Sequence, residues 1–488
     1  MVIESLKYKI LQQFGFAPTQ EQGQALDTFV SFLTDRDPQA VMILRGSAGT
    51  GKTSLSGAIV RTLLQIRQKV MLLAPTGRAA KVFSLGSGAP AYTIHRRIYR
   101  EKAFAGVDGQ FSLNDNLYTD TLFMVDEASM IANMGLGGTT FGSGCLLDDL
   151  VKFVYQGHND RLLLIGDKAQ LPPVGEEESP ALSASVMEGY GLKVYECDLN
   201  EVLRQSQSSG ILYNATFIRQ MITHDAVTGL PLIRFKGFAD IVMMPGAELV
   251  ESLGDSYHHV GMDETMVITR SNKRANIYNN GIRNMVLDRE EELSSGDMLM
   301  IVKNNYFWTE KEKKESGEGS AGAVPAFLAN GDRAKVLRVS NYIELYGFRF
   351  ATLLLQLPDY DDYEMQVTGM LDTLQSEAPA LTHEQQEELF RQVEEDYQHF
   401  VPLKADRMKS IRQDAYFNAL QIKYAYAVTC HKAQGGQWAH VYVDQGYMTD
   451  DMLTPDYIHW LYTAFTRATD KLFLVNWPKE QTCEPTDL

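Results

Sequence analysis

The sequence predicts an α/β fold built on two parallel sheets. First, short apolar runs alternate with helical patterns in two separate stretches of the chain, which is typical of parallel sheets. Second, these runs are continuous, as expected for strands buried on both faces. Third, a glycine-rich loop joins the first run to a helical pattern. The runs of the first stretch are VMIL (41–44), VMLLA (70–74), TLFMV (121–125) and RLLLI (161–165).

The second stretch predicts another parallel sheet, interrupted by a long insertion. Its strands are ETMVIT (264–269), AYAVT (425–429), HVYV (440–443) and KLFLV (471–475). We therefore place one α/β domain at 1–215 and a second at 216–300 together with 415–488.

The insertion at 300–415 predicts a small accessory domain. It contains a charged, glycine-rich segment at 310–323, which we expect to be a solvated loop. The segments NGDRAKVLRV and FRFATLLLQL then predict a small antiparallel barrel or sheet. From Thr382 to about 400 we expect a helix, because Thr382 and Gln385 form a capping box and the apolar residues that follow recur on one face.

Two shorter irregular pieces lie within the first domain. Asp108-Gly109, between extended segments at 97–120, predicts a β-hairpin. The segment GLGGTTFGSG (135–144) predicts a loop by its composition.

Length and composition describe an ordinary globular protein. The 488 residues allow about three domains. A composition of 44% hydrophobic and 22% charged residues excludes a mostly disordered chain. No apolar run reaches the roughly 18 residues of a membrane span, and Glu4, Lys7 and Lys9 interrupt any signal-peptide core. The four cysteines have neither metal-ligand spacing nor the density of a disulfide framework. We therefore expect a cytoplasmic protein with no membrane partner.

The acidic balance restricts how a nucleic acid could bind. The chain has 45 basic and 62 acidic side chains, a net charge of −17. Nucleic-acid-binding domains normally present a basic face. A nucleic-acid partner must therefore be held by local groups that line a groove.

The strongest motif is a phosphate-binding loop at 46–53, called the phosphate loop below. Its residues Gly46, Ser47, Ala48, Gly49, Thr50, Gly51, Lys52 and Thr53 match G-x-x-x-x-G-K-T, between a strand and a helix. The glycines allow backbone N–H groups to converge on phosphate oxygens at a helix N-terminus. Lys52 supplies a point charge to the phosphates, and the Thr53 hydroxyl is a ligand for Mg²⁺. The motif predicts ATP and Mg²⁺ as cofactors.

A pair of carboxylates follows the strand TLFMV. Asp126 can hold Mg²⁺ through water, and Glu127 can polarise the attacking water. Such a pair is often two surface acids, but its position after a buried strand favours the catalytic interpretation.

The motifs together resemble superfamily 1 helicases of the 5′→3′ group, superfamily 1B, in the RecD-like and Dda-like branch. The resemblance rests on Gln22 in PTQEQGQAL, LAPTGRAAK, TIH, DEAS, GDKAQLPPVG, LNEVLRQ, VTCHKAQGGQW and YTAFTRA, in the family order. It implies two RecA-like P-loop motor domains with ATP between them, an inserted SH3-like β domain, and a β-hairpin pin. The chain departs from the family at Ala433, where HKSQG usually has serine.

The resemblance assigns nucleotide-site roles to several residues. Gln22 is similar to the glutamine that reads adenine, and Gln170 to the γ-phosphate sensor. Arg204 and Arg467 resemble the two arginines that reach the γ-phosphate. Gly435 is also predicted to be a nucleotide-binding residue. An arginine at the γ-phosphate can contribute about 10³–10⁵ in rate.

The resemblance also implies a track for single-stranded DNA. Its residues are Pro75, Thr76, Thr93, His95, Asn272, Lys273, Arg274, Thr429 and His431. These groups suit contacts to phosphate and sugar without sequence readout. Phe104 and Phe111 of the hairpin would separate strands at the fork, or equally form the hairpin's own cross-strand pair.

We therefore predict an ATP-dependent helicase that moves 5′→3′ on single-stranded DNA and unwinds duplex DNA at single-strand/double-strand junctions, as a monomer, in DNA repair, recombination or replication. Two alternatives stay open. One is an RNA helicase or RNP remodeller of the same superfamily, because DNA and RNA differ at the 2′-hydroxyl. The other is a nucleotide-gated subunit without catalysis.

Overall fold

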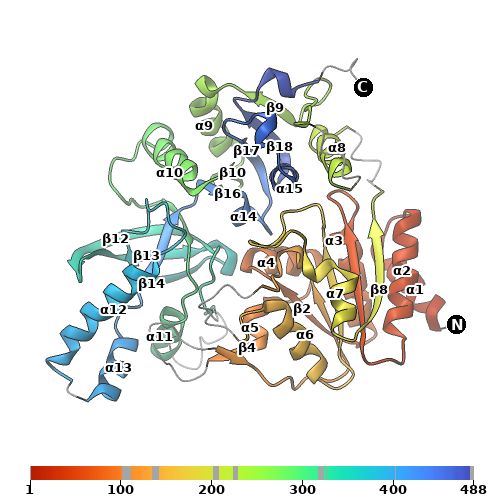
Figure 1. Cartoon of the computed structure of the whole chain (residues 1–488), viewed down its shortest axis with the longest axis horizontal. Coiled ribbons are helices and arrows are strands. Elements are labelled where there is room, and N and C mark those ends of the chain that lie inside the picture. Colours follow the sequence, from red (N-terminus) through yellow and green to blue (C-terminus); the bar gives the residue numbers. More distant parts are fainter. Residues whose placement is uncertain are drawn as a thin grey trace. The chain divides into compact units, whose positions relative to one another are not determined.

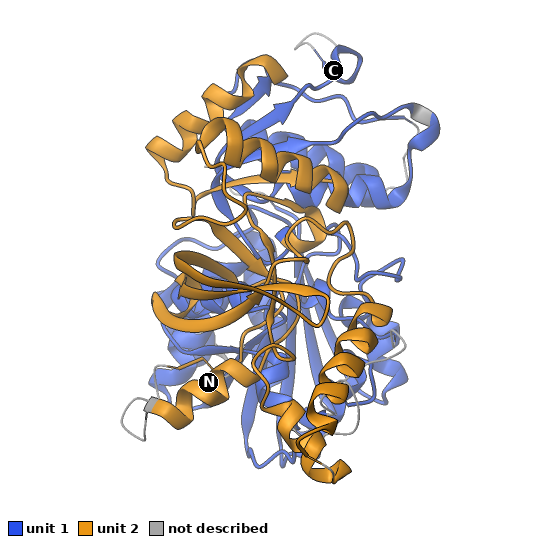
Figure 2. Ribbon diagram, turned by 90° about the vertical axis from the view of Figure 1, so that its left-hand side faces the viewer, with its two compact units in different colours: residues 1–245, 433–488 blue, residues 246–432 orange. Residues whose placement is uncertain are grey.

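A computed structural model of the chain describes residues 2–101, 111–134, 142–201, 208–223, 229–316, 324–325, 327–401 and 403–483. It divides into two compact units, residues 1–245 with 433–488 (unit 1) and residues 246–432 (unit 2), coloured separately in Figure 2. Within the described residues, no helix combines the length and apolar character needed to cross a membrane.

Unit 1 contains a six-stranded parallel sheet in the order β3-β2-β6-β7-β1-β8 (Figure 1). The strands are β1 (Ala40–Gly46), β2 (Lys69–Ala74), β3 (Ala91–Thr93), β6 (Thr121–Val125), β7 (Arg161–Gly166) and β8 (Lys193–Leu199). The four runs predicted from the first stretch are β1, β2, β6 and β7, so the α/β prediction is confirmed for this sheet.

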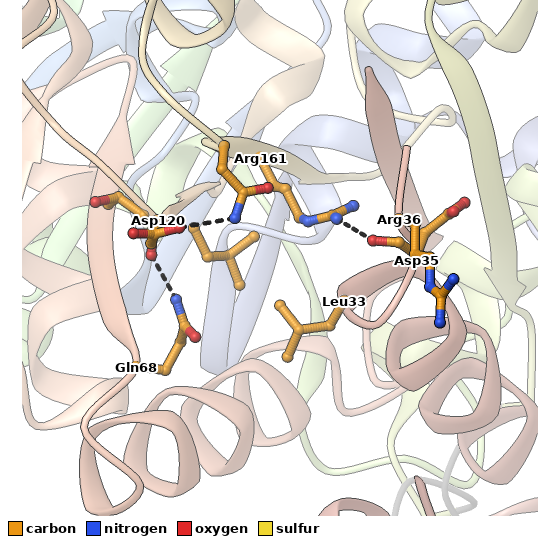
Figure 3. Close-up of a pocket in the computed structure, with 9 residues that line it drawn as sticks. Leu33, Asp35, Arg36, Gln68, Asp120 and Arg161 are labelled. Atoms are coloured by element: carbon orange, nitrogen blue, oxygen red, sulfur yellow. Dashed lines mark hydrogen bonds between the residues drawn. The ribbon is translucent and has the colours of Figure 1, made fainter. Parts of the chain in front are cut away.

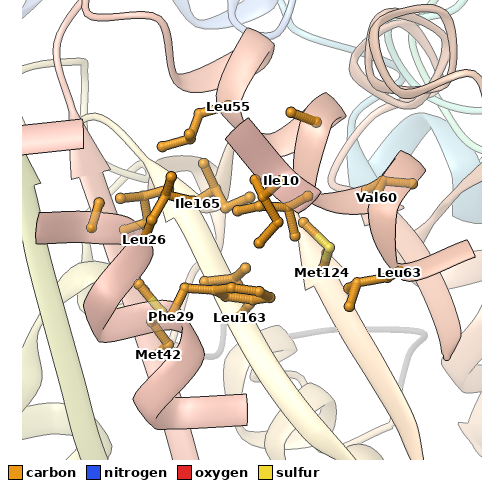
Figure 4. Close-up of a cluster of buried hydrophobic side chains, with 14 of the residues drawn as sticks. Ile10, Leu26, Phe29, Met42, Leu55, Val60, Leu63, Met124, Leu163 and Ile165 are labelled. Carbon is orange, nitrogen blue, oxygen red and sulfur yellow. The ribbon is translucent and has the colours of Figure 1, made fainter. Parts of the chain in front are cut away.

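Helices cover both faces of this sheet. On one face, α1 (Val2–Phe14), α2 (Gln20–Leu33) and α3 (Lys52–Gln65) bury a cluster that includes Ile10, Phe29 and Met42 (Figure 4). On the other face, α5 (Ile94–Ile98), α6 (Leu146–Gln156) and α7 (Ala184–Gly189) pack against alternate strand residues such as Val41 and Phe123. Burial of successive side chains on opposite faces explains the continuous apolar runs.

The remaining elements of unit 1 complete the first domain and add a second parallel sheet. α4 (Gly77–Ser87) follows β2, and β4 (Tyr99–Glu101) pairs antiparallel with β5 (Phe111–Leu113), which confirms the predicted hairpin strands. β9 (Ile241–Met244), β18 (Ala468–Val475) and β17 (Trp438–Asp444) pair in parallel in that order. With them lie α8 (Gly210–Thr223) and α15 (Pro455–Phe465).

Short 3₁₀ helices of unit 1 are η1 (Ala128–Met130), η2 (Pro180–Leu182), η7 (Asp450–Met452) and η8 (Lys479–Gln481). β3, β8 and β9 were not predicted as strands from the sequence. β8 is half exposed at the sheet edge, so its residues do not form a continuous apolar run.

Unit 2 contains a closed five-stranded barrel. Its strands are β11 (Met298–Ile301), β12 (Arg333–Leu345), β13 (Phe348–Leu357), β14 (Tyr363–Met370) and β15 (Leu420–Tyr424). All neighbours pair antiparallel except β14 and β15, which pair in parallel. The barrel confirms the prediction for the insertion. Because β15 closes it, the barrel continues past the predicted boundary at 415.

The rest of unit 2 is mainly helical. β10 (Thr265–Thr269) and β16 (Ala427–Thr429) pair in parallel. The helices are η4 (Gly246–Glu248), α9 (Leu249–His259), α10 (Asn272–Gly281), the π-helix η5 (Ile282–Val286), α11 (Phe307–Ser316), η6 (Pro358–Tyr360), α12 (His383–Gln398) and α13 (Lys404–Arg412). α14 (Cys430–Ala433) crosses the division between the units.

Two predictions about the insertion have opposite outcomes. The capping box of Thr382 and Gln385 is present at α12, where Leu389 and Val393 are buried, as predicted. The loop predicted at 310–323 is wrong over its first half, because residues to Ser316 continue α11. Trp308 is buried in that helix and donates from Nε1 to the Asn418 carbonyl at 2.9 Å, which holds an otherwise charged helix in place.

Candidate functional site

The phosphate loop leaves the carboxyl end of β1 and enters α3. Gly49 and Gly51 have φ of +77° and +81°, a region that favours glycine. Lys52 Nζ folds back over the loop and donates to the carbonyls of Gly46 and, at 2.9 Å, Ser47. A Cβ at Gly46 would lie 2.8 Å from Lys52 Cγ and 2.9 Å from Thr50 Oγ1. The loop is therefore shaped to bring a cation and backbone amides to one point, as an anion site requires.

The predicted carboxylates lie at the same edge of the sheet. Asp126 directly follows β6, and its N–H donates to the Leu73 carbonyl at 3.0 Å. Asp126 Oδ1 accepts from the Glu127 N–H at 2.9 Å, and Glu127 adopts a left-handed φ of +53°. Such backbone strain is typical of functional positions. Burial and the Glu127 charge raise the pKa of Asp126 to about 7, while the nearby Lys52 acts in the opposite direction.

These residues fit Mg²⁺ only in part. Among the described residues, no group of three or more histidine, cysteine or acidic side chains could enclose a metal. Thr53, which is exposed, and the half-buried Asp126 could supply oxygen ligands. Mg²⁺ usually takes one or two protein oxygens and completes its shell with water and substrate phosphates. The donor set is therefore that of a metal bound together with a nucleotide.

Gln22 is buried and bridges α2 to the phosphate loop. Its Oε1 accepts from the Thr19 N–H at 3.0 Å, while Thr19 Oγ1 accepts from the Gln22 N–H, completing a capping box. Its Nε2 donates to the Thr50 carbonyl at 2.9 Å. Both ends of the amide are thus used within the chain, and its predicted contact with adenine stays a prediction.

The loop at 167–171, which contains the predicted sensor Gln170, is held by the C-terminal segment of unit 1. Leu171 donates to Thr463 Oγ1 at 2.7 Å and accepts from Gln434 Nε2 at 2.7 Å. His459 Nδ1 lies 2.9 Å from the Ala169 carbonyl. Gln170 is buried, and its Oε1 has no hydrogen-bond partner among the described residues. That amide oxygen is available for a donor that enters the site.

Tyr462 of α15 joins this loop to the phosphate loop. Its hydroxyl accepts from the Ala48 N–H at 3.0 Å and donates to Asp167 Oδ2 at 2.6 Å. Sequence reasoning missed this role, although Tyr462 lies inside the quoted motif YTAFTRA.

Arg219 of α8 was also missed. Its Nη1 donates to Ser47 Oγ of the phosphate loop, and the guanidinium lies 3.5 Å from the Asn200 carbonyl. Arg219 lies outside every motif, so no sequence signal indicated it.

The two arginines predicted to reach the γ-phosphate have different outcomes. Arg204 lies outside the described residues. Arg467 is buried, and its guanidinium donates to the Thr463 carbonyl, the Gly436 carbonyl and Thr466 Oγ1 at 3.1–3.2 Å. Its described hydrogen bonds are therefore all within the C-terminal segment, and its role at the phosphate stays a prediction.

Gly435 packs against the start of α4. At a φ of +73°, a Cβ on it would lie 3.0 Å from Thr76 Oγ1 and 3.1 Å from Ala79 Cβ. Close by, Arg78 lies 4.3 Å above the Trp438 ring and donates to the Gln437 carbonyl. The motifs LAPTGRAAK and HKAQGGQW are thus in direct contact. The nucleotide contact of Gly435 stays a prediction.

The predicted DNA-track residues of unit 1 lie at the carboxyl ends of two adjacent strands. Pro75 and Thr76 follow β2, Thr93 ends β3 with Ala74 paired to it, and His95 lies in the first turn of α5. Thr76 and Thr93 are N-caps whose hydroxyls accept from Ala79 and Arg96 N–H groups. Burial lowers the pKa of His95 to about 4, so it is neutral at pH 7.

The track residues of unit 2 have the same arrangement. Thr269 of β10 pairs with Thr429 of β16, so the segments that follow these strands lie at one edge. Asn272, Lys273 and Arg274 form the first turn of α10, and Lys273 and Arg274 are exposed. His431, on α14, is exposed as well.

Two lysines add charge near this edge of unit 2 and were missed. Burial lowers the pKa of Lys432 to about 8. Burial and the Lys432 charge lower the pKa of Lys423, on β15, to about 8, and its Nζ donates to the Ser376 carbonyl.

The hairpin residues are only partly described. Phe104 and Asp108-Gly109 lie outside the described residues, as do residues 135–141 of the glycine-rich loop. Phe111 pairs with Glu101 and packs against the core cluster under α5 and α6. This packing favours a structural role for Phe111. Strand separation stays a prediction.

A polar pocket of about 380 Å³ lies at the opposite edge of the sheet (Figure 3). Its residues precede β1, β2, β6 and β7, whereas the phosphate loop follows β1. Asp120 accepts from Gln68 and Asn159 at 2.7 Å, and Arg161 donates to the Asp35 carbonyl. Because the lining residues lie at the amino ends of these strands, the pocket is separate from the nucleotide site, and several of its polar groups bond to one another.

Comparison with known proteins gives two family matches. The model described as an AAA domain matches residues 17–227, and the model described as a UvrD-like helicase C-terminal domain matches residues 424–475. The first contains the phosphate loop and Asp126, and the second contains Tyr462 and Arg467.

Individual relatives match parts of the chain. The ATP-dependent RecD2 DNA helicase of Deinococcus radiodurans is 30% identical over 157 residues, 32% of this chain and 18% of that protein. The ATP-dependent DNA helicase dda of Enterobacteria phage T4 is 25% identical over 267 residues, 53% of this chain and 55% of that protein. The matched region thus spans about half of dda and under a fifth of RecD2.

Among solved structures, a Pif1 helicase from Bacteroides in complex with ADP-AlF3 and ssDNA aligns over 96% of this chain and 95% of that chain. The identity is 13% and the TM-score is 0.46.

Proposed function

The chain is a relative of the superfamily 1B helicases of the RecD-like and Dda-like branch, and from this premise we propose that it is an ATP-dependent DNA helicase moving 5′→3′ along single-stranded DNA. The observation that carries the proposal is the convergence of the phosphate loop, Asp126 and the 167–171 loop. Both loops contact Tyr462 of the C-terminal segment. A nucleotide that enters the phosphate loop therefore reaches backbone groups that α15 also holds.

The chemistry of hydrolysis follows from these residues. Thr53 and, through water, the ionised form of Asp126 would hold Mg²⁺, which would supply neutralisation of phosphate charge when bound together with ATP. We assign Lys52 to binding the phosphates, Glu127 to orienting and polarising the attacking water, and Gln170, whose buried amide oxygen has no partner among the described residues, to sensing the γ-phosphate.

The placement of the predicted track supports a nucleic-acid partner despite the net charge of −17. Threonine, amide, imidazole and cationic groups gather at the carboxyl edges of β2 and β3 in unit 1 and of β10 and β16 in unit 2. Such groups bind the sugar-phosphate backbone without reading sequence. Because few cations are involved, affinity should fall only modestly as salt rises.

The main test is an unwinding assay with 5′-tailed and 3′-tailed duplexes. The proposal expects ATP-dependent unwinding of the 5′-tailed duplex alone, and preference for the 3′ tail would overturn the polarity. Lys52→Ala should abolish DNA-stimulated ATP turnover while single-strand affinity remains. Lys152→Ala, which removes an exposed lysine whose one ion pair among the described residues is with Asp148 on α6, is the matched control and should keep full activity.

The same preparation tests the two alternatives. Stimulation of ATP turnover by poly-U as strong as by poly-dT would replace the DNA assignment with an RNA helicase. Nucleotide binding without any DNA-stimulated turnover would favour a nucleotide-gated subunit. Sedimentation at working concentration tests the proposed monomer.

A further inference from the structure

Arg219 places a guanidinium at the phosphate loop from outside every recognised motif. It lies on α8, and its Nη1 donates to Ser47 Oγ, the second residue of the loop. Its other described hydrogen-bond acceptor is the Asn200 carbonyl, at 3.5 Å. Both acceptors are neutral.

The positive charge of Arg219 has no ionic partner within the part of the chain that the structure describes. A nearby acid, Glu21, is engaged by the backbone N–H groups of Asn200 and Glu201. Arg45 provides a contrast, because its guanidinium is paired with Asp198 at 2.6 Å and Glu196 at 2.8 Å. Arg219 is thus a half-buried cation with no ionic partner among the described residues.

The surroundings of Arg219 indicate which anion would complete the site. Burial and Asp167 raise the pKa of the Tyr462 hydroxyl, and the Arg219 charge acts in the opposite direction, so the guanidinium lies near the group that binds Ala48. Ser47 and Ala48 belong to the loop whose amides cradle phosphate. The planar guanidinium fork matches phosphate oxygens better than an ammonium does.

We propose that Arg219 contacts the terminal phosphate of the bound nucleotide and distinguishes ATP from ADP. On nucleotide binding, Arg219 exchanges the Ser47 hydroxyl for a phosphate oxygen. This inference rests on the proposed function, because it assigns a further residue to the same nucleotide site. It proposes a further arginine for the site, besides the predicted Arg204 and Arg467.

The experiment compares binding of fluorescent ATP and ADP analogues to the full chain and to three variants. Arg219→Ala should weaken the ATP analogue by about 10- to 100-fold while the ADP analogue changes by less than about threefold. Arg219→Lys should recover part of the ATP affinity, because it keeps the charge but loses the fork. Arg36→Ala, which removes an exposed arginine beside the pocket at the opposite sheet edge, is the charge-matched control.

Equal loss of ATP and ADP affinity in Arg219→Ala would overturn the proposal, because a misplaced loop weakens both nucleotides. Affinities equal to those of Arg36→Ala would overturn it as well. Failure of the proposed function is distinguishable. If the unmodified chain binds nucleotide but shows no DNA-stimulated turnover, the helicase assignment fails while the ATP-to-ADP ratio still decides the role of Arg219.

Discussion

Removal of one hydroxyl group tests how firmly the phosphate loop is tied to α15. Tyr462 is 1% exposed, and its hydroxyl accepts from the Ala48 N–H at 3.0 Å and donates to Asp167 Oδ2 at 2.6 Å. Tyr462→Phe keeps the ring and its packing but removes both hydrogen bonds. The variant therefore isolates the link between the two loops.

The expected loss follows from the two partners left behind. A hydrogen bond to a charged group contributes about 1.5–3 kcal/mol, and an unsatisfied buried N–H costs about 1–3 kcal/mol. Asp167 Oδ1 still accepts from the Ala169 N–H, which reduces the penalty. We therefore expect Tyr462→Phe to lower the free energy of unfolding of unit 1 by about 2–4 kcal/mol.

The assay is urea unfolding followed by tryptophan fluorescence, which reports mainly on unit 1 because Trp438, Trp460 and Trp477 lie there and only Trp308 lies in unit 2. Tyr8→Phe is the control. That side chain lies on α1 of unit 1, is 62% exposed and makes no side-chain hydrogen bond among the described residues, so its change should stay within about 0.5 kcal/mol. A Tyr462→Phe transition that coincides with the control would refute the reasoning.

Three further predictions concern other contacts. Gln22→Ala removes the capping partner of Thr19 and the bond to the Thr50 carbonyl, so thermal unfolding should report a loss of about 1–2 kcal/mol; an unchanged melting temperature would contradict this. His95 has its pKa lowered from 6.5 to about 4 by burial. The unfolded chain therefore gains a proton first as the pH falls, and stability present above pH 6.5 is lost between pH 6.5 and 4, by up to about 3 kcal/mol. The free energy of unfolding of His95→Gln, measured against pH, should lack this loss. The raised pKa of Asp126 contributes equally to the unmodified chain and to the variant, so it does not affect the difference between their profiles. Thr382→Ala should lower the free energy of unfolding of unit 2 by about 1 kcal/mol, because it removes the N-cap of α12, and Thr382→Ser should be near neutral. ATP turnover should not change in either variant. Reduced turnover would show that α12 affects the nucleotide site.

Local patterns were sufficient to predict much of the fold. β1, β2, β6 and β7 are continuous apolar runs because both faces of their sheet are covered, and the capping box at Thr382 depends only on residues three apart. The phosphate loop and Asp126 were predictable for the same reason, since each directly follows one strand. These features require no knowledge of distant contacts.

The rest depends on tertiary contacts that no local pattern contains. Glutamate and lysine are good helix formers, but α11 forms where a loop was predicted because Trp308 binds the distant Asn418 carbonyl. β15 closes the barrel through pairing of Tyr424 with Leu299. Arg219 reaches Ser47 across 172 residues, so its side chain could not be assigned to the nucleotide site from spacing.

The contact at Gly435 has a consequence for how this sequence can diverge. Its φ of +73° and the 3.0 Å approach to Thr76 Oγ1 leave no volume for a methyl group. Thr76 caps α4, and Ala79 is already the smallest chiral residue, so neither can shrink to make space. We therefore expect relatives to keep the same residues at positions 76, 79 and 435 together, although more than 350 positions separate Gly435 from the other two.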